Sequence, residues 1–323
     1  MIASKERPAS TRSTIAPAPS PSSEAIARAK RSERKAVLTG LAFVSPWLIG
    51  FLVFTLYPVF ASAYLSFTDY RVLAPPHWVG MANYRNLVND HDYFLPSLWD
   101  TIFMFLELPL ALTMGLALAL LLDLKLRGMA IYRTIFYLPS IVPVVSSAVL
   151  WMWVLNPQHG LMNECLHALH INGPAWLASP AWAKPAMILM DLWGVGGGMV
   201  IYLAALQGVP KPLYEAAELD GATGWRKIWH VTIPQISPVI FFNLIMGVIG
   251  TFQYFTQTYI MTNGGPDNST LFYAIYLYQN AFQYFRMGTA CAMAWILFLI
   301  TLVATFVVFK SSAGWVYYEG DTK

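Results

Sequence analysis

Two acidic residues interrupt long stretches that otherwise carry no charge. Glu107 lies within residues 101–122 and Asp191 lies within residues 185–210. An ionisable side chain is costly to keep inside an apolar helix, so each acid is a candidate for contacting a transported ligand. A structural role is the alternative for Glu107, because Pro109 frees a backbone carbonyl close to it in a kinked helix.

The residues around Asp191 suit sugar recognition. A carboxylate accepts hydrogen bonds from hydroxyl groups, and the indole of Trp193 offers a flat apolar face to a sugar ring. Gly194 and Gly197, the latter within a triple glycine, let the backbone approach a ligand or a neighbouring helix. Helix packing explains the same residues equally well, and both interpretations are open.

A second polar group follows further along the chain. Thr251, Gln253, Tyr254 and Gln257 occur together in a stretch that is otherwise apolar. Because Gln253 and Gln257 are four residues apart, we expect them to share one face of a helix. Their polar groups would bond to a neighbouring helix or line a water-filled path, so we include all four residues among the candidates for a substrate path.

Residues for covalent or metal chemistry do not form a recognisable pattern. His167 and His170 are three residues apart but have no evident third ligand, and the two cysteines, Cys165 and Cys291, form no CxxC motif. No GxxxxGK[ST] phosphate loop occurs in the sequence. The sequence therefore predicts no enzyme, no cofactor, no metal site and no hydrolysis of ATP by this chain itself.

The composition places these residues in a membrane protein. The chain has 323 residues, of which 57% are hydrophobic and 11% are charged. Soluble domains have about 45–50% apolar and about 25% charged residues, so a soluble fold would leave much apolar surface in water. The net charge of +3 does not indicate nucleic-acid binding, because the basic residues cluster beside apolar runs.

Six apolar runs reach the length of about 20 residues that a bilayer-crossing helix requires. We predict an all-α membrane protein whose transmembrane domain covers residues 36–310, and we take Pro238 as the natural start of the fifth helix. Residues 268–285 carry no charge, but their many aromatic side chains favour a segment at the membrane interface over a seventh span. The six predicted spans are about 37–64, 100–122, 134–155, 185–206, 238–261 and 287–309.

The distribution of basic residues sets the predicted orientation. With six spans and both termini in the cytoplasm, sixteen of the twenty Lys and Arg residues lie on the cytoplasmic side, as the positive-inside rule requires. Residues 1–35 lack the apolar core of a signal peptide and are predicted to be a disordered basic cytoplasmic tail. Residues 207–237 form a long cytoplasmic loop in this topology, and residues 311–323 form a cytoplasmic tail.

The 207–237 loop is predicted to contain two helices joined by a turn. Pro212 suits the first turn of a helix, and Gly221 suits the left-handed conformation that ends one. A second helix would then run through Trp225 towards Pro234. A small apolar face with charged ends suits insertion into a groove of a partner protein, although a solvated helical connection is the simpler alternative.

The loop sequence resembles the EAA signature of ABC importer permeases. The resemblance rests on Glu215-Ala216-Ala217, on Gly221 four residues beyond Ala217, and on Ile233-Pro234 twelve residues further on. It covers roughly residues 37–310 and is closest to the branch that contains maltose-type and glycerol-phosphate-type permeases. The other segments that resemble this branch are Arg133–Pro139, Asn156-Pro157, Leu192-Trp193-Gly194 and Thr262–Pro266.

This resemblance implies a type I ABC importer permease subunit in a bacterial or archaeal plasma (inner) membrane. Its partners would be an ATP-binding subunit (the ATPase), a second homologous permease and an extracytoplasmic solute-binding protein that delivers a sugar. In maltose-type relatives the fourth and fifth spans contribute to the sugar site, and Gly197 falls where a relative can have a larger contacting residue. The residues implied to contact the ATPase are Glu215, Ala216, Ala217, Asp220 and Gly221.

The charges inside the spans help to choose between substrates. A phosphate-bearing ligand favours nearby Lys or Arg, and none lies in the middle of a predicted span. The sequence therefore favours an oligosaccharide or disaccharide over glycerol 3-phosphate. In a third possibility, a secondary transporter, Glu107 and Asp191 would relay protons, but the EAA-like loop would then have no purpose.

Overall fold

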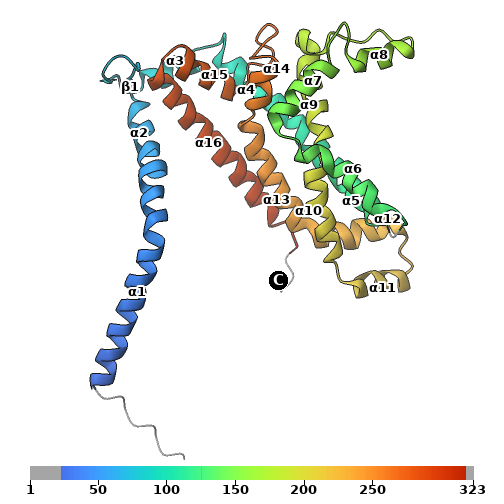
Figure 1. The fold of residues 1–323 in the computed structure, drawn as a ribbon, viewed down its shortest axis with the longest axis horizontal. Helices are drawn as coiled ribbons and strands as arrows, with labels where there is room; N and C mark the ends of the chain where they lie inside the picture. Colours follow the sequence, from blue (N-terminus) through green and yellow to red (C-terminus); the bar gives the residue numbers. More distant parts are fainter. Residues whose placement is uncertain (1–22, 125, 318–323) are drawn as a thin grey trace, which may run out of the picture. The chain divides into compact units, whose positions relative to one another are not determined.

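The computed structural model describes residues 23–124 and 126–317, with side chains described from residue 30 onward, and these residues are mostly helical (Figure 1). The chain forms two compact units, Met1–Phe60 and Ala61–Lys323. Both candidate sites belong to the second unit.

The first unit consists of α1 (Ser23–Phe51), η1 (Leu52–Leu56) and the beginning of α2 (Tyr57–Leu65). Its apolar side chains are exposed on all sides, with Phe43 83% and Phe54 81% exposed. A helix that is apolar all round suits a lipid environment. The structure differs from the predicted disordered tail, because residues 23–35 are helical, as their Ala, Arg, Lys and Glu content favours; residues 1–22 lie outside the described part.

The second unit is built from helices with one very short hairpin. The strands β1 (Thr68–Asp69) and β2 (His77–Trp78) pair antiparallel. The remaining elements, in chain order, are α3 (Ala82–Val88), α4 (Phe94–Phe103), η2 (Met104–Leu106), α5 (Glu107–Leu122), α6 (Met129–Ile141), α7 (Val144–Val154), α8 (Leu161–Ala168), η3 (Trp176–Ala178), α9 (Pro180–Trp193), α10 (Gly196–Gln207), α11 (Lys211–Leu219), α12 (Gly224–Lys227), η4 (Ile228–Thr232), α13 (Ile233–Phe252), α14 (Thr256–Met261), α15 (Tyr273–Tyr278), η5 (Gln279–Gln283) and α16 (Met287–Ser312).

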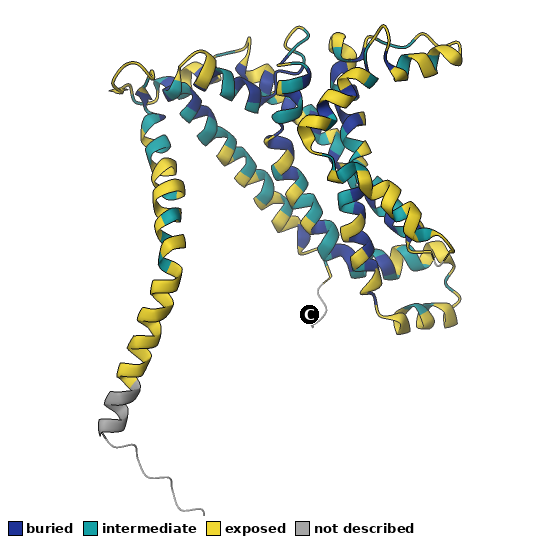
Figure 2. Cartoon of the chain, viewed as in Figure 1, coloured by how far each residue is buried: buried dark blue, intermediate teal, exposed yellow. Residues whose placement is uncertain are grey.

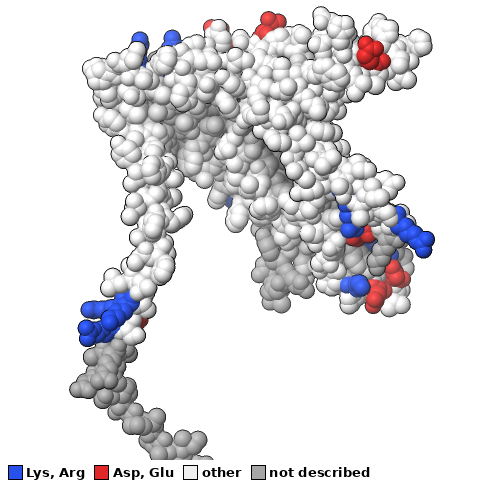
Figure 3. Space-filling view, viewed as in Figure 1, with Lys and Arg blue, Asp and Glu red and all other residues white. Residues whose placement is uncertain are grey.

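Several of these helices are long and apolar enough to cross a membrane. Four helical stretches of the described chain meet this condition by themselves, and the number rises to six if each of two bent helix pairs counts as one span. On the face shown in Figure 3, most charged side chains of the second unit lie at its two ends, and most of the surface between them is uncharged. The predicted fold class, an all-α membrane protein, is therefore confirmed.

The helices α5, α10 and α13 enclose the part of the core that lies nearest the loop of residues 207–237. Ala119 on α5 is fully buried, Tyr202 on α10 is almost fully buried, and both pack in one cluster with Ile236 on α13. Figure 2 shows buried residues on the inner sides of the helices of the second unit, whereas many outward-facing residues are exposed. Exposed apolar faces of this kind are expected where lipid replaces water.

The predicted span at 134–155 is not a straight helix. Its two halves, α6 and α7, meet at an angle of 98°. Val142 is extended, with φ −65° and ψ 128°, and Pro143 follows it. The proline ring disfavours helical backbone in the residue before it, which explains why the helix breaks at this position.

The predicted span at 185–206 is also bent, by 43° between α9 and α10. The bend lies at Gly194 and Val195, just before the triple glycine. A Cβ atom at Gly196 would overlap the backbone carbonyl oxygen of Phe136, whereas one at Gly197 would make only ordinary contact with Ser140, at 3.7 Å. The absence of a side chain at Gly196 therefore lets α10 approach α6 closely.

We expect Gly196→Ala to destabilise the fold and Gly197→Ala to be tolerated. Because the added methyl group of the first variant meets backbone rather than a flexible side chain, we expect it to cost about 1–3 kcal/mol of stability, as overpacking typically does. Thermal unfolding in detergent, followed by size-exclusion chromatography, measures the difference. Equal midpoints for the two variants would contradict the close approach of α10 to α6.

The fifth predicted span begins and ends elsewhere than expected. Pro238 does not start the helix; an unbroken helical stretch runs from Gly224, through η4, into α13. Because Pro238 has no N–H group, the carbonyl of Pro234, four residues earlier, lacks its usual backbone donor. The Ser237 hydroxyl donates to that oxygen instead, at 2.6 Å. The helix then stops at Phe252, so Gln253 and Gln257 lie on opposite sides of a break and do not share one helical face.

Candidate functional site

A cavity of about 370 Å³ lies among α5, the junction of α9 with α10, and α13. Its volume falls within the range of about 300–1,000 Å³ that is common for small-molecule sites. The lining includes both intramembrane acids together with small and polar residues. The lining residues are Glu107, Leu108, Ala111, Leu112, Asp191, Gly194, Val195, Gly198, Tyr202, Asn243, Gly247, Gly250, Thr251, Tyr254 and Gln257.

Helix breaks place the polar groups of this cavity. Glu107 begins α5 directly after the tight turn η2, Asp191 lies in the last turn of α9, and Tyr254 follows the end of α13. The Tyr254 hydroxyl donates a hydrogen bond of 2.6 Å to Oδ2 of Asp191. Broken helices at membrane depth are tolerated where they line a cavity, and they commonly carry the binding groups of transporters.

The chemistry of the cavity is that of hydrogen-bond recognition. Two carboxylates, two tyrosine hydroxyls, and the side chains of Asn243, Thr251 and Gln257 line it, and none of the described lining residues is Lys or Arg. The carboxylate of Asp191 already accepts from Tyr254 and has further acceptor positions for ligand hydroxyls. Such a set of groups suits a neutral ligand with many hydroxyl groups.

The structure brings together five of the eight residues predicted for the substrate path. Asp191, Gly194, Thr251, Tyr254 and Gln257 all line the cavity.

The other three predicted residues, Trp193, Gly197 and Gln253, do not line this cavity. Trp193 packs edge-on against Trp151, with ring centroids 6.0 Å apart. Gly197 faces Ser140 on α6. Gln253 lies beside a separate, mostly apolar hollow that Tyr278 and Phe282 also line. The bend after Trp193 and the break after Phe252 turn the side chains of Trp193 and Gln253 away from the cavity. Neither break follows from residue spacing alone.

Sequence reasoning missed Tyr202 and Asn243. Tyr202 is only 1% exposed and lies on α10, two turns beyond the bend. Asn243 is a polar residue in the middle of the apolar helix α13, and this is the signal that identifies it as a candidate.

A second candidate site is the loop of residues 207–237, which we call the coupling loop. Its first helix, α11, ends in a complete Schellman motif: the Ala222 amide donates to Ala217 O at 2.9 Å, and the Gly221 amide donates to Glu218 O at 3.0 Å. Gly221 has φ +74°, the left-handed conformation that the sequence predicted for it. Backbone hydrogen bonds within the loop therefore define the turn.

Side chains join the two helices of the coupling loop and leave its outer surface open. Lys227 forms an ion pair of 2.7 Å with Glu218, and the Tyr214 hydroxyl lies 3.0 Å from the Thr232 hydroxyl. Leu219 is 90% exposed. A helix–turn–helix element that is held by such contacts and carries an exposed apolar side chain has the properties of a docking surface. The five residues predicted for ATPase contact lie along α11 and its turn, at one end of the second unit (Figure 1).

Comparison with known proteins decides the family. Residues 111–312 match the family described as binding-protein-dependent transport system inner membrane component. The chain belongs to this family. The resemblance to ABC importer permeases, which the coupling loop suggested from sequence, is confirmed.

The similarity extends over most of this permease. It is 40% identical over 294 residues to the probable ABC transporter permease protein YesP of Bacillus subtilis, and the alignment covers 90% of this chain and 95% of YesP. It is 34% identical over 282 residues to the lactose transport system permease protein LacF of Rhizobium radiobacter, covering 85% of this chain and 94% of LacF. A chain of a bacterial alginate ABC transporter, solved with an alginate pentasaccharide-bound periplasmic protein, superimposes with a TM-score of 0.77 at 25% identity and covers 88% of this chain and 96% of that one.

The matched region of the permease contains the coupling loop and most of the cavity. Asp191, Tyr254 and Gly221 all lie inside residues 111–312, whereas Glu107 lies just before them. Both candidate sites therefore belong to the shared part of the fold.

Proposed function

We propose that this permease forms half of a translocation path that imports a neutral sugar, an oligosaccharide or disaccharide, at the expense of ATP hydrolysed by a partner subunit. The observation that carries the proposal is the cavity among α5, α9, α10 and α13, because it offers carboxylate, hydroxyl and amide groups and no described cation. A phosphorylated ligand would require Lys or Arg near its phosphate. The names of relatives support a carbohydrate: LacF is named for lactose, and the solved neighbour is an alginate ABC transporter. Alginate is an acidic polysaccharide, so the neutral class rests on the cavity alone.

Three partners follow from this proposal. The family name supports a solute-binding protein, which would deliver the sugar at the outer face. The ATPase would receive the coupling loop, with Glu215, Ala216, Ala217, Asp220 and Gly221 at the contact. A second homologous permease would complete the path, since six spans are few for enclosing a disaccharide, and membrane lipid would cover the outward apolar faces.

The proposed orientation places the coupling loop and both termini in the cytoplasm of a bacterial or archaeal cell. The basic residues support it, because Lys30, Arg31, Arg34 and Lys35 precede the apolar part of α1, and Arg226 and Lys227 lie in the coupling loop. This arrangement follows the positive-inside rule. The cavity then lies between the coupling loop and the outer face.

Uptake into proteoliposomes tests the substrate class. The complete transporter is reconstituted with ATP inside, and uptake of a labelled disaccharide is measured in the presence of unlabelled neutral sugars or sugar phosphates. We expect neutral sugars alone to compete. Stronger competition by glycerol 3-phosphate or by a sugar phosphate would favour the phosphate-type branch, and ATP-independent uptake by this chain alone would favour a secondary transporter.

A further inference from the structure

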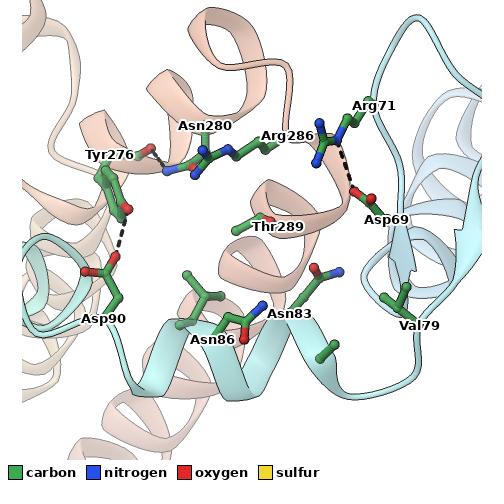
Figure 4. A pocket seen from close by; sticks show the side chains of 12 residues that line it. Asp69, Arg71, Val79, Asn83, Asn86, Asp90, Tyr276, Asn280, Arg286 and Thr289 are labelled. Atoms are coloured by element: carbon green, nitrogen blue, oxygen red, sulfur yellow. Dashed lines mark hydrogen bonds and ion pairs between the residues drawn. The ribbon is translucent and has the colours of Figure 1, made fainter.

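A second polar pocket, of about 420 Å³, lies at the end of the second unit opposite the coupling loop (Figures 1 and 4). It is formed by β1, α3, α15, η5 and the beginning of α16, and it shares no residue with the cavity of the proposed sugar path. In the orientation proposed above it faces the compartment of the solute-binding protein. The inference below therefore rests on the proposed function.

Backbone hydrogen bonds hold the frame of this pocket. The backbones of Arg71 and Arg286 form an isolated antiparallel β-bridge, and the Gly288 backbone amide donates to Tyr70 O at 3.0 Å. On the side of α3, the Asn83 amide donates to Ser66 O and Thr68 O at 2.8 and 2.9 Å. Because these contacts link α3, β1 and α16, the pocket is formed before any partner arrives.

The acidic residues of the pocket are already engaged within the chain. Oδ1 of Asp90 accepts from the backbone amides of Asp92 and Tyr93, and its Oδ2 accepts from the Tyr276 hydroxyl at 2.8 Å. Burial, together with this hydrogen bond to Asp90, raises the pKa of Tyr276 to about 12, so the hydroxyl stays protonated and donates. Asp69 pairs with Arg71 at 3.4 Å.

The basic side of the pocket, in contrast, holds an arginine, Arg286, without an ion-pair partner among the described residues. Its guanidinium lies 6.0 Å from the centre of the Tyr284 ring. Figure 4 shows Arg286 and Arg71 on one side of the pocket and Asn86 on the other. A guanidinium has five N–H donors and pairs best with a carboxylate.

We infer that this pocket receives an acidic side chain of the docked solute-binding protein and that Arg286 is its ion-pair partner. Arginine is enriched at protein interfaces, and the pocket is polar and open, as a site for a partner's charged side chain requires. Asn86 and Thr289 line the same pocket and offer further hydrogen bonds to that side chain. The arrangement fixes where the binding protein docks without taking part in sugar recognition inside the membrane.

Binding measurements test this inference directly. The transporter is placed in nanodiscs, and a fluorescent solute-binding protein, the one that stimulates the wild-type ATPase, is titrated against it. We expect Arg286→Glu to weaken binding by about tenfold or more, because reversal of the charge places like charges opposite each other. The matched control is Arg85→Glu. Arg85 is an exposed arginine on α3, which borders the pocket, but it does not line the pocket, and we expect this variant to change the affinity less than about twofold.

The outcomes separate this inference from its rivals. Equal weakening by the two variants would mean general electrostatic attraction and would overturn the specific pocket, as would no weakening by Arg286→Glu. A loss that occurs only in nanodiscs with anionic lipid would assign Arg286 to a lipid headgroup instead. Because the readout is binding rather than uptake, an error in the proposed sugar would not affect it.

Discussion

We expect the Gly221→Asp variant to enter the membrane normally, but its rate of ATP-driven sugar uptake should be at least about tenfold lower than that of the wild type. Apart from Gly221 and its two chain neighbours, no heavy atom of the described residues lies within 4 Å of the position that a Cβ would take at Gly221, so the loop itself has space for the new side chain. The added carboxylate would stand beside Asp220 and near Glu218 on the proposed ATPase contact, where an extra charge that must be desolvated or opposed costs several kcal/mol. Uptake and ATPase activity, measured on the same proteoliposomes, test the expectation.

The matched control for this variant is Gly221→Asn. Asparagine has nearly the shape of aspartate, and both tolerate the left-handed conformation that φ +74° requires, but asparagine adds no charge. We expect Gly221→Asn to retain most of the uptake. Normal uptake by Gly221→Asp would contradict the coupling role of this turn, and equal losses in both variants would assign the effect to the backbone instead.

A second large effect is expected at the cavity. Asp191→Asn keeps the size of the side chain but removes the carboxylate that accepts the Tyr254 hydroxyl and faces the ligand. Hydrogen bonds to a charged group contribute about 1.5–3 kcal/mol, which corresponds to about tenfold to a hundredfold in affinity for the sugar. Substrate-dependent uptake, measured as the concentration for half-maximal rate, checks this.

Two companion variants separate substrate binding from structure. Tyr254→Phe removes the hydroxyl that holds Asp191 but leaves the carboxylate, so we expect a smaller loss than in Asp191→Asn. Trp193→Ala changes a neighbour of Asp191 that does not line the cavity, and we expect it to leave the half-maximal concentration nearly unchanged. A larger loss in Trp193→Ala than in Asp191→Asn would move the sugar site to the indole side of α9.

Local rules explain why the coupling loop could be predicted in detail. Pro212 near the start of α11 and Gly221 after its end are positions set by backbone chemistry, which operates within a few residues. The apolar runs likewise indicated the fold class, because lipid permits only segments that satisfy their own backbone hydrogen bonds. Both kinds of signal are present in the sequence itself.

The cavity could be predicted only in part, because its shape depends on breaks within helices. The 43° bend after Trp193 and the end of α13 at Phe252 do not follow from the spacing of the polar residues. These breaks separate Gln253 from Gln257 and turn Trp193 away, although all three looked equivalent by spacing. Asn243 on α13 joins Asp191 on α9 in the lining because α13 packs beside α10, which follows α9 after the bend, and this is a tertiary contact.

The most direct test of the account is co-purification of the tagged chain from solubilised membranes of cells that produce the whole transporter. The account predicts that an ATPase subunit and a second permease purify with the wild-type chain. It also predicts that the ATPase is lost from a Glu215→Ala/Gly221→Asp variant. A chain that purifies alone and transports sugar alone would contradict the importer assignment, and Glu107 and Asp191 would then become the first residues to test as an ion-coupling pair.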